Sequence, residues 1–210
     1  HCEHILRHKN PDEPLVLISK APIRGGTQVF IYTKDQPKLF ARLVAALDSK
    51  KVNIFDAQIM TNKDGYAMDT FVVLEQNGEA VNSPSRQQSI KRALELFIAG
   101  KPDLSRQKTR LSRQMRQFNV PPKVVFLPGN TAKRTMIELA ALDTPGLLAN
   151  IGEVFQRCDV NIHAAKITTI GERAEDFFMI SNSDDQALSS EQQSALKRAL
   201  IEQLSQQTEG

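Results

Sequence analysis

Apolar and polar residues along the chain follow two periods, one typical of β-strands and the other of α-helices. Short apolar or alternating runs rich in branched and aromatic residues predict strands. These runs cover residues 14–19, 27–33, 52–61, 67–75, 123–127, 135–142, 160–169 and 174–181. Apolar residues spaced three or four apart predict amphipathic helices between them, with inward faces that include Leu39, Ile90, Leu147 and Leu196.

Local signals place several element ends. Ser83-Pro84 predicts a helix start, with serine at the cap and proline at the first helical position. Ser189 and Gln192 have the spacing of a capping box before the last helix. Gly65, at the end of the segment Asn-Lys-Asp-Gly, predicts a hairpin turn between two strands.

The pattern occurs twice. An apolar strand ends at Asp35 or Asp143, turns through a proline, and continues as an amphipathic helix. The offset of 108 residues also aligns 52–54 with 160–162, and an offset of 107 aligns 69–71 with 176–178. A repeat of this length predicts two copies of one small domain rather than a solenoid.

Each copy has the order strand–helix–strand–strand–helix with a final strand, which is the ferredoxin-like plan. We therefore expect an α+β protein with two antiparallel sheets, each covered by helices on one face. The expected division is 1–24 for the tail of a preceding domain and a connecting strand, 25–128 for the first domain, and 129–210 for the second. The first domain includes the basic segment 100–122, predicted to be a solvated linker.

Edge strands decide how the two copies are completed. Residues 123–127 are expected to supply the last strand of the first copy, whereas the second copy has too few residues after its last helix for such a strand. Its strand 135–142 would then have an open edge. Residues 15–19 form a strand without a place in the first copy, so we expect them to cross over and fill that edge.

Composition and charge describe an ordinary globular chain, with 40% hydrophobic and 24% charged residues. A net charge of +3 does not argue for nucleic acid or an anionic membrane, and no run is long enough to span a bilayer. Two cysteines do not make a disulfide framework, which favours a reducing, cytoplasmic setting. Because residue 1 is histidine, we expect a piece of a longer protein.

No catalytic or metal motif is evident. His1, His4, His8 and Cys2 have ligand chemistry, but the end of a preceding helix explains them better than a metal site. His163 is interpreted as a packed or surface histidine. Asp69 and Asp176 recur at matching positions, yet shared ancestry accounts for that, so they are not assigned acid–base roles.

The turn between strand and helix is the best candidate site. The start of a helix exposes free backbone N–H groups that favour a carboxylate, and Gly146 lets a ligand approach the backbone closely. Asp143 can accept hydrogen bonds from an ammonium group. Together these groups suit an amino acid, but an equally good interpretation is that the turn is structural and Asp143 caps the helix.

A resemblance to known proteins sharpens this picture. Residues 143–148 (DTPGLL) followed by 160–162 (VNI) resemble the signature of ACT domains, which are small ferredoxin-like modules that often bind amino acids. Residues 56–61, 64–71 and 167–176, with 1–6 and 14–17, are similar to the bifunctional uridylyltransferase/uridylyl-removing enzyme family. The resemblance covers essentially the whole chain.

The resemblance implies a regulatory role. In that family a nucleotidyltransferase domain, which takes Mg²⁺ and UTP, adds UMP to the PII signal protein, and a hydrolase domain removes it. Glutamine bound to the ACT pair favours removal. Neither catalytic motif occurs here, so the chain is expected to be inert, without cofactor or metal, and to have glutamine and PII as partners. Membrane and nucleic acid are not expected, and the resemblance leaves a homodimer open.

The implied glutamine site lies at the second turn, and a second site of the same kind lies at the first. The first set is Asp143, Thr144, Pro145, Gly146, Leu147, Leu148, Asn161 and Ile162. The second set is Asp35, Gln36, Pro37, Lys38, Leu39, Asn53 and Ile54, where Lys38 replaces the glycine. The alternatives are an ACT pair that binds another amino acid and an interaction module that uses the basic segment.

Overall fold

A computed structural model describes residues 5, 8, 13–19, 22–23, 25–101, 121–128, 131–144, 146–171 and 173–209. Residues 102–120 of the basic segment 100–122 lie outside these described residues, and so do His1, Cys2, His4 and Pro145. The chain divides into two compact units, His1–Arg106 and Gln107–Gly210.

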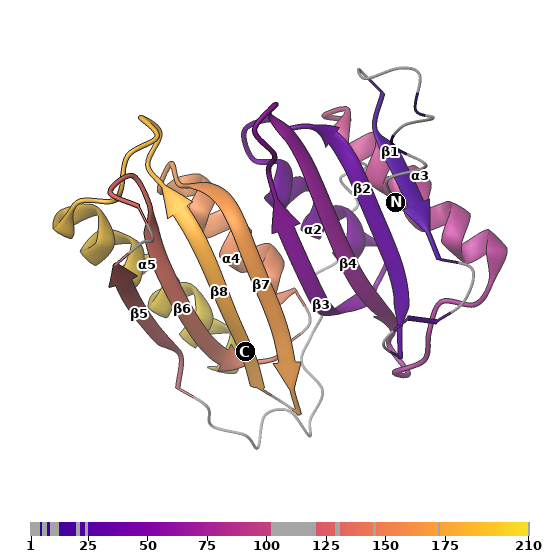
Figure 1. Ribbon diagram of the computed structural model, residues 1–210. Coiled ribbons are helices and arrows are strands. Elements are labelled where there is room, and N and C mark those ends of the chain that lie inside the picture. The colour runs from indigo at the N-terminus through magenta and orange to yellow at the C-terminus, as the bar shows by residue number, and fades with distance from the viewer. Residues whose placement is uncertain are drawn as a thin grey trace. The chain divides into compact units, whose positions relative to one another are not determined.

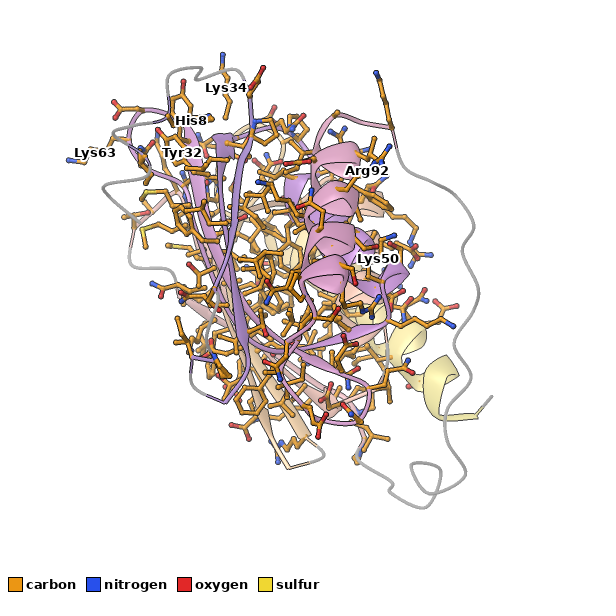
Figure 2. All side chains as sticks on the ribbon, turned by 90° about the vertical axis from the view of Figure 1, so that its right-hand side faces the viewer. His8, Tyr32, Lys34, Lys50, Lys63 and Arg92 are labelled. Atoms are coloured by element: carbon orange, nitrogen blue, oxygen red, sulfur yellow. The ribbon has the colours of Figure 1, made fainter. Side chains whose placement is uncertain are left out.

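The first unit is a four-stranded antiparallel sheet with two helices on one face (Figure 1). Its elements are β1 (Leu15–Ile18), β2 (Thr27–Lys34), α2 (Leu39–Ser49), β3 (Val52–Met60), β4 (Tyr66–Glu75) and α3 (Pro84–Ile98). The strands pair in the order β1-β2-β4-β3. Buried side chains fill the space between this sheet and its helices, whereas Lys34, Lys63 and Arg92 lie at the surface (Figure 2).

The second unit repeats this arrangement. Its elements are β5 (Lys123–Pro128), β6 (Thr135–Leu142), α4 (Leu147–Arg157), β7 (Asn161–Ile170), β8 (Arg173–Ser181) and α5 (Ser190–Glu209). The strands pair antiparallel in the order β5-β6-β8-β7. The alternation of side chains in each strand explains the one-sided core, because every second residue faces the helices.

The edge strands differ from the sequence-based expectation. β1 pairs with β2 of its own unit, with Val16 opposite Ile31, so the predicted crossover of residues 15–19 into the second copy is wrong. β5 pairs with β6, with Val124 opposite Leu139, so residues 123–127 complete the second unit and not the first. Each unit thus takes its edge strand from the residues before it, and the division of the chain falls at 106/107 instead of the expected 128/129.

The two units agree in fine detail. Both pairings just described keep the offset of 108, and both units interrupt the register at the same place, between Ile54 and Asp56 and between Ile162 and Ala164. The capping box predicted at the last helix is present, since the Ser189 N–H donates to Gln192 Oε1 at 2.9 Å and the Gln192 N–H donates to Ser189 Oγ at 3.2 Å.

Large buried side chains form one core in each unit. In the second unit Phe178 of β8 is completely buried and meets Phe155 of α4 edge-on, with ring centroids 5.1 Å apart and planes at 81°. Phe71 is buried at the corresponding position of the first unit. Burial of such side chains is the main favourable contribution to folding of each unit.

Candidate functional site

The turn from the first long strand into the first helix has the same backbone in both units. Lys38 precedes α2 with φ 68°, and Gly146 precedes α4 with φ 79°, both in the left-handed region. Glycine adopts this region without a steric penalty, whereas lysine does not. The two units share this backbone conformation although one has lysine and the other glycine at the position. The fold, and not glycine alone, therefore determines the turn.

The first N–H of each helix donates within its own turn, Leu39 to the Gln36 carbonyl at 3.1 Å and Leu147 to the Thr144 carbonyl at 2.9 Å. Among the described residues no side chain makes a capping hydrogen bond to α2 or α4. The interpretation of Asp143 as a helix cap is therefore wrong for these residues. Free N–H groups at a helix start carry partial positive charge and favour an anion.

Asp143 instead contacts a residue of β7, which is separated from β6 by β8. Its side chain takes part in a hydrogen bond with the side chain of Thr169, near the end of β7. The first unit repeats this contact, because Thr61 Oγ1 donates to Asp35 Oδ2 at 3.0 Å. In each unit the acid that precedes the helix therefore contacts a threonine of the hairpin, Thr61 just after β3 or Thr169 near the end of β7.

A second acid lies deeper in each unit. Asp69 of β4 is 1% exposed, and Asp176 of β8 is 0% exposed. The Met60 N–H donates to Asp69 Oδ1 at 3.3 Å. Neither carboxylate oxygen of Asp176 has a hydrogen-bond partner in the described part of the chain. These positions face the helices, where the strand pattern otherwise places apolar residues.

Burial dominates the electrostatics of this cluster. The pKa of Asp176 is raised to about 7 mainly by burial, against the nearby Thr168 N–H, which does not reach hydrogen-bond geometry, and with a further contribution from the charge of Asp143. Burial also raises the pKa of Asp69 to about 7, opposed by the Met60 N–H and aided by Asp35. The pKa of Asp143 is raised by burial and lowered by the Thr169 contact.

The remaining residues of the predicted turn sites have mostly buried side chains. Thr144 is 5% exposed, and Leu147 and Leu148 face the core, as Leu39 does in the first unit. They can therefore offer a ligand only their backbone groups. Gln36 is held by the first unit itself, since its Nε2 donates to the Ile98 carbonyl at 3.2 Å and its Oε1 accepts from Arg42 at 3.0 Å. Pro37 is exposed on the turn.

The structure does not bring the other predicted pocket residues to the turn of their own unit. Asn161 and Ile162 begin β7, whereas Thr169, which binds Asp143, is near its other end. Eight strand residues separate the two positions by roughly 25 Å, at about 3.3 Å per residue. Asn53 and Ile54 at the start of β3 are separated from Asp35 in the same way.

Sequence reasoning missed the inner half of this cluster. Asp69 and Asp176 were noticed as repeated but not assigned to the turn, and Thr61 and Thr169 were not considered. The sequence does contain a signal for these two acids. Each stands at an inward position of an otherwise apolar strand, where an acid is rarely found without a specific role. Proximity to Asp35 and Asp143, however, appears only when the strands are paired.

Histidine and metal chemistry add little. His163 Nε2 lies 2.8 Å from Ser181 Oγ and 3.6 Å from Asp185 Oδ1, which agrees with the expected packed histidine. The described residues contain no group of three or more His, Cys, Asp or Glu able to hold a metal ion. Within the same residues, no helix combines the length and apolar character needed to cross a bilayer.

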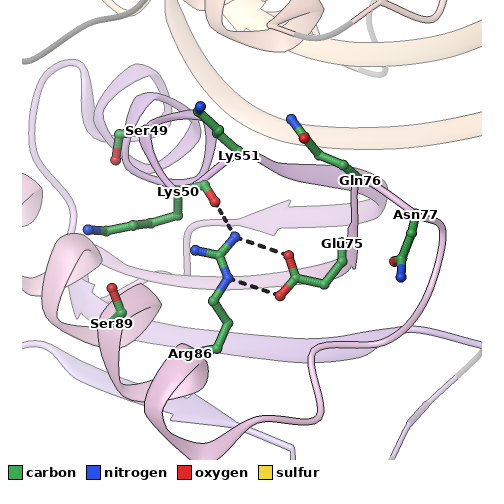
Figure 3. A pocket seen from close by; sticks show the side chains of 8 residues that line it. All are labelled: Ser49, Lys50, Lys51, Glu75, Gln76, Asn77, Arg86 and Ser89. Carbon is green, nitrogen blue, oxygen red and sulfur yellow. Dashed lines mark hydrogen bonds and ion pairs between the residues drawn. The ribbon is translucent and has the colours of Figure 1, made fainter.

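A hollow of about 620 Å³ on the first unit lies away from the predicted turn sites (Figure 3). It is lined by Ser49, Lys50, Lys51, Glu75, Gln76, Asn77, Arg86 and Ser89. Its central cation is already neutralised, because Arg86 makes two hydrogen bonds to Glu75, at 2.9 and 3.0 Å, and a third to the Lys50 carbonyl. In this hollow Arg86 therefore links α3 to β4 and to the end of α2.

Replacing Arg86 with alanine is expected to lower the free energy of unfolding of the first unit by roughly 1–2 kcal/mol, because a bidentate ion pair and a helix-end carbonyl lose their donor. Lys91→Ala is the control, since Lys91 and Glu95 are 3.9 Å apart on the exposed face of the same helix. It should change stability by less than about 0.5 kcal/mol. Urea unfolding measures the stability of both variants. Equal effects of Arg86→Ala and Lys91→Ala would contradict a stabilising role of the Arg86 contacts.

Comparison with known proteins places the fold. No family model matches the chain. Among solved structures, the aspartate kinase from Synechocystis superposes with a TM-score of 0.50 at 16% identity, over 86% of this chain and 28% of the kinase. This likeness concerns the fold alone, and it agrees with two ferredoxin-like units of ACT type.

Curated relatives are much closer in sequence. The chain is 52% identical over 206 residues to the bifunctional uridylyltransferase/uridylyl-removing enzyme of Vibrio parahaemolyticus, 49% over 207 residues to that of Vibrio atlanticus, and 48% over 206 residues to that of Vibrio cholerae. Each match covers 98% of this chain but only 23–24% of the relative. The chain therefore corresponds to a segment, about a quarter in length, of the bifunctional uridylyltransferase/uridylyl-removing enzymes.

Proposed function

We propose that this chain is the glutamine-sensing regulatory module of an enzyme that uridylylates and deuridylylates the PII signal protein, and that glutamine favours deuridylylation. The observation that carries the proposal is the second turn, where Asp143, held by Thr169, comes shortly before a helix start that has no side-chain cap. The names of the relatives and the ACT-type fold support the regulatory setting.

The turn is complementary to the backbone of a free amino acid. The ligand carboxylate accepts hydrogen bonds from N–H groups at the start of α4, where the helix dipole favours a negative charge. Its ammonium group donates to Asp143, whose orientation is fixed by Thr169. Gly146 leaves the backbone accessible between these two groups.

The first turn is the weaker candidate for the same ligand. It has the same backbone and the same acid–threonine contact, but Lys38 stands where the second unit has Gly146. A lysine side chain adds bulk and a positive charge beside the position that the ligand ammonium would occupy. We therefore propose the second turn as the principal site.

In calorimetry, glutamine is expected to bind the intact chain with higher affinity than the other common amino acids. Gly146→Asn should weaken binding at least tenfold, because asparagine tolerates the left-handed backbone but its side chain blocks the N–H groups. Lys38→Ala is the matched control on the first turn and should bind like the parent chain.

Two results would contradict this assignment. If Gly146→Asn binds normally and Lys38→Ala loses binding, the ligand belongs to the first turn. If another amino acid binds and glutamine does not, the ACT-type module serves a different signal. Circular dichroism of each variant must first show that it is folded.

We also propose that the chain by itself carries neither uridylyl transfer nor uridylyl removal, because its candidate site contains ligand-binding groups but no assembled catalytic set. Incubation with UTP, Mg²⁺ and PII should leave PII unmodified, and uridylylated PII should stay modified. The full-length enzyme is the positive control in both assays. Turnover above a protein-free blank would contradict the proposal.

A further inference from the structure

The inner acid of the second unit has no structural explanation so far. Asp176 is completely buried, and neither of its oxygens has a hydrogen-bond partner among the described residues. Folded proteins rarely leave a buried carboxyl group in this condition, because an unpaired buried charge is strongly destabilising. The apolar packing of the unit would be served better by a leucine or valine at this position.

Among the described residues, Asp143 is the acid that acts on Asp176, and no cation does so. The strand residue opposite it is Leu139 on β6, and Ile167 of β7 is likewise buried. The helix faces packed against this side of the sheet are apolar, at Leu147 and Ile151 of α4 and Leu196 and Leu200 of α5.

Charged residues of the same elements lie elsewhere. Glu138, Glu175 and Lys166 alternate onto the other face of the sheet, and Arg173 pairs with Glu175 at 3.2 Å. On the helices Glu153 is half-buried, and Arg157, Glu191, Lys197, Arg198 and Glu202 are exposed. Asp143 is the charge that acts on Asp176. Asp176 therefore responds to Asp143 and, among the described residues, to no basic partner.

We propose that Asp143 and Asp176 form a proton-exchanging acid pair, in which Asp176 holds a proton when the site is empty and releases it when the ammonium group of a ligand binds at Asp143. This inference rests on the proposed function and adds to it the ligand class, a primary ammonium, and the way the site is regulated. The O–H bond of Asp176 breaks, the proton passes to solvent, and the ligand amine remains protonated.

The physical reason is a change in the local charge. Without ligand, an ionised Asp143 disfavours a second negative charge nearby, so the buried Asp176 keeps its proton. An ammonium group at Asp143 offsets that repulsion and adds attraction for a second carboxylate. Because the pKa of Asp176 is about 7, both states are accessible near neutral pH.

The first unit provides an internal comparison. Asp69 is buried as deeply as Asp176, but one of its oxygens already accepts a hydrogen bond from Met60, and the outer acid Asp35 is exposed. Exposure to water weakens the influence of a charge at Asp35 on the inner acid. Asp69→Asn is consequently the matched control for Asp176→Asn.

Glutamine affinity is expected to rise roughly tenfold from pH 6 to pH 8, because one proton must leave a group with a pKa of about 7. Calorimetry in two buffers of different ionisation heat should show close to one proton released per glutamine at pH 6 and almost none at pH 8. In Asp176→Asn, a neutral mimic of the protonated acid, affinity should stay at the pH 6 level and proton release should vanish. Asp69→Asn should behave like the parent chain. Equal proton release by Asp176→Asn and the parent would overturn the proposal.

A ligand-free measurement separates this inference from the proposed function. The side-chain carboxyl ¹³C signal of Asp176 should titrate near pH 7 and should shift to a lower pKa in Asp143→Asn, where the repulsion is removed. If the parent chain binds no amino acid but this titration is observed, the proposed function fails and the coupling of the two acids stands. If Asp176 titrates near pH 4, or is unaffected by Asp143→Asn, the acid pair itself is refuted.

Discussion

Asp176→Asn is expected to stabilise the second unit by up to about 4 kcal/mol above pH 7 and to have little effect near pH 3. In the folded chain burial raises the pKa of Asp176 from 3.8 to about 7. The folded state therefore binds this proton more tightly than the unfolded state does. Between these two pKa values the free energy of unfolding falls as the pH rises, because unfolding lets the group ionise in water.

The measurement is urea unfolding at half-unit steps from pH 4 to pH 8. The parent chain should lose stability across this window, and the variant should lose less, so the difference between them should widen with pH and level off above pH 7. Asp69→Asn should act in the same window on the first unit, because burial raises the pKa of Asp69 to about 7 as well. A difference that is constant with pH would show that asparagine acts through packing and not through ionisation.

Phe178→Ala is expected to lower the free energy of unfolding of the second unit by about 3–5 kcal/mol. Phe178 is fully buried and meets Phe155 edge-on, so its loss removes both apolar burial and an aromatic contact. Its neighbour Phe177 is 38% exposed on the other face of the same strand. Phe177→Ala is therefore the control and should change stability by less than about 1 kcal/mol.

Hydrogen exchange resolved by segment identifies which unit is affected. Phe178→Ala should lose protection in β6, β7 and β8, while Phe71→Ala, at the matching position of the first unit, should lose it in β2, β3 and β4. Successive residues of a strand face opposite sides of the sheet. Equal effects of Phe177→Ala and Phe178→Ala would therefore contradict the assignment of Phe178 to the core face of β8.

Periodicity identified the elements but not the edge pairings. The offset of 108 residues also takes Pro14 to Pro122 and Val16 to Val124, which places both short strands at the beginning of a repeat. We nevertheless expected residues 123–127 to complete the first copy, following the usual order of the ferredoxin-like plan. An apolar run indicates that a segment is a strand, but its partner is decided by long-range packing that the run does not encode.

The candidate site was predicted in part for a similar reason. The strand-to-helix turn, with Asp143 and Gly146, follows from local sequence, because backbone conformation and helix ends depend on neighbouring residues. The contribution of Thr169 and Asp176 depends on how β6, β7 and β8 pair, so no local pattern reveals it. The distance of Asn161 from the turn of its own unit likewise follows from the length and pairing of β7, which no local pattern gives.

The position of β1 and β5 at the start of their units makes each repeat self-contained along the chain. A cut between Lys101 and Pro121 would fall outside every described strand and would separate no described strand from its partner within a unit. A duplication event could thus add or delete a whole unit as one cassette, without exchange of strands.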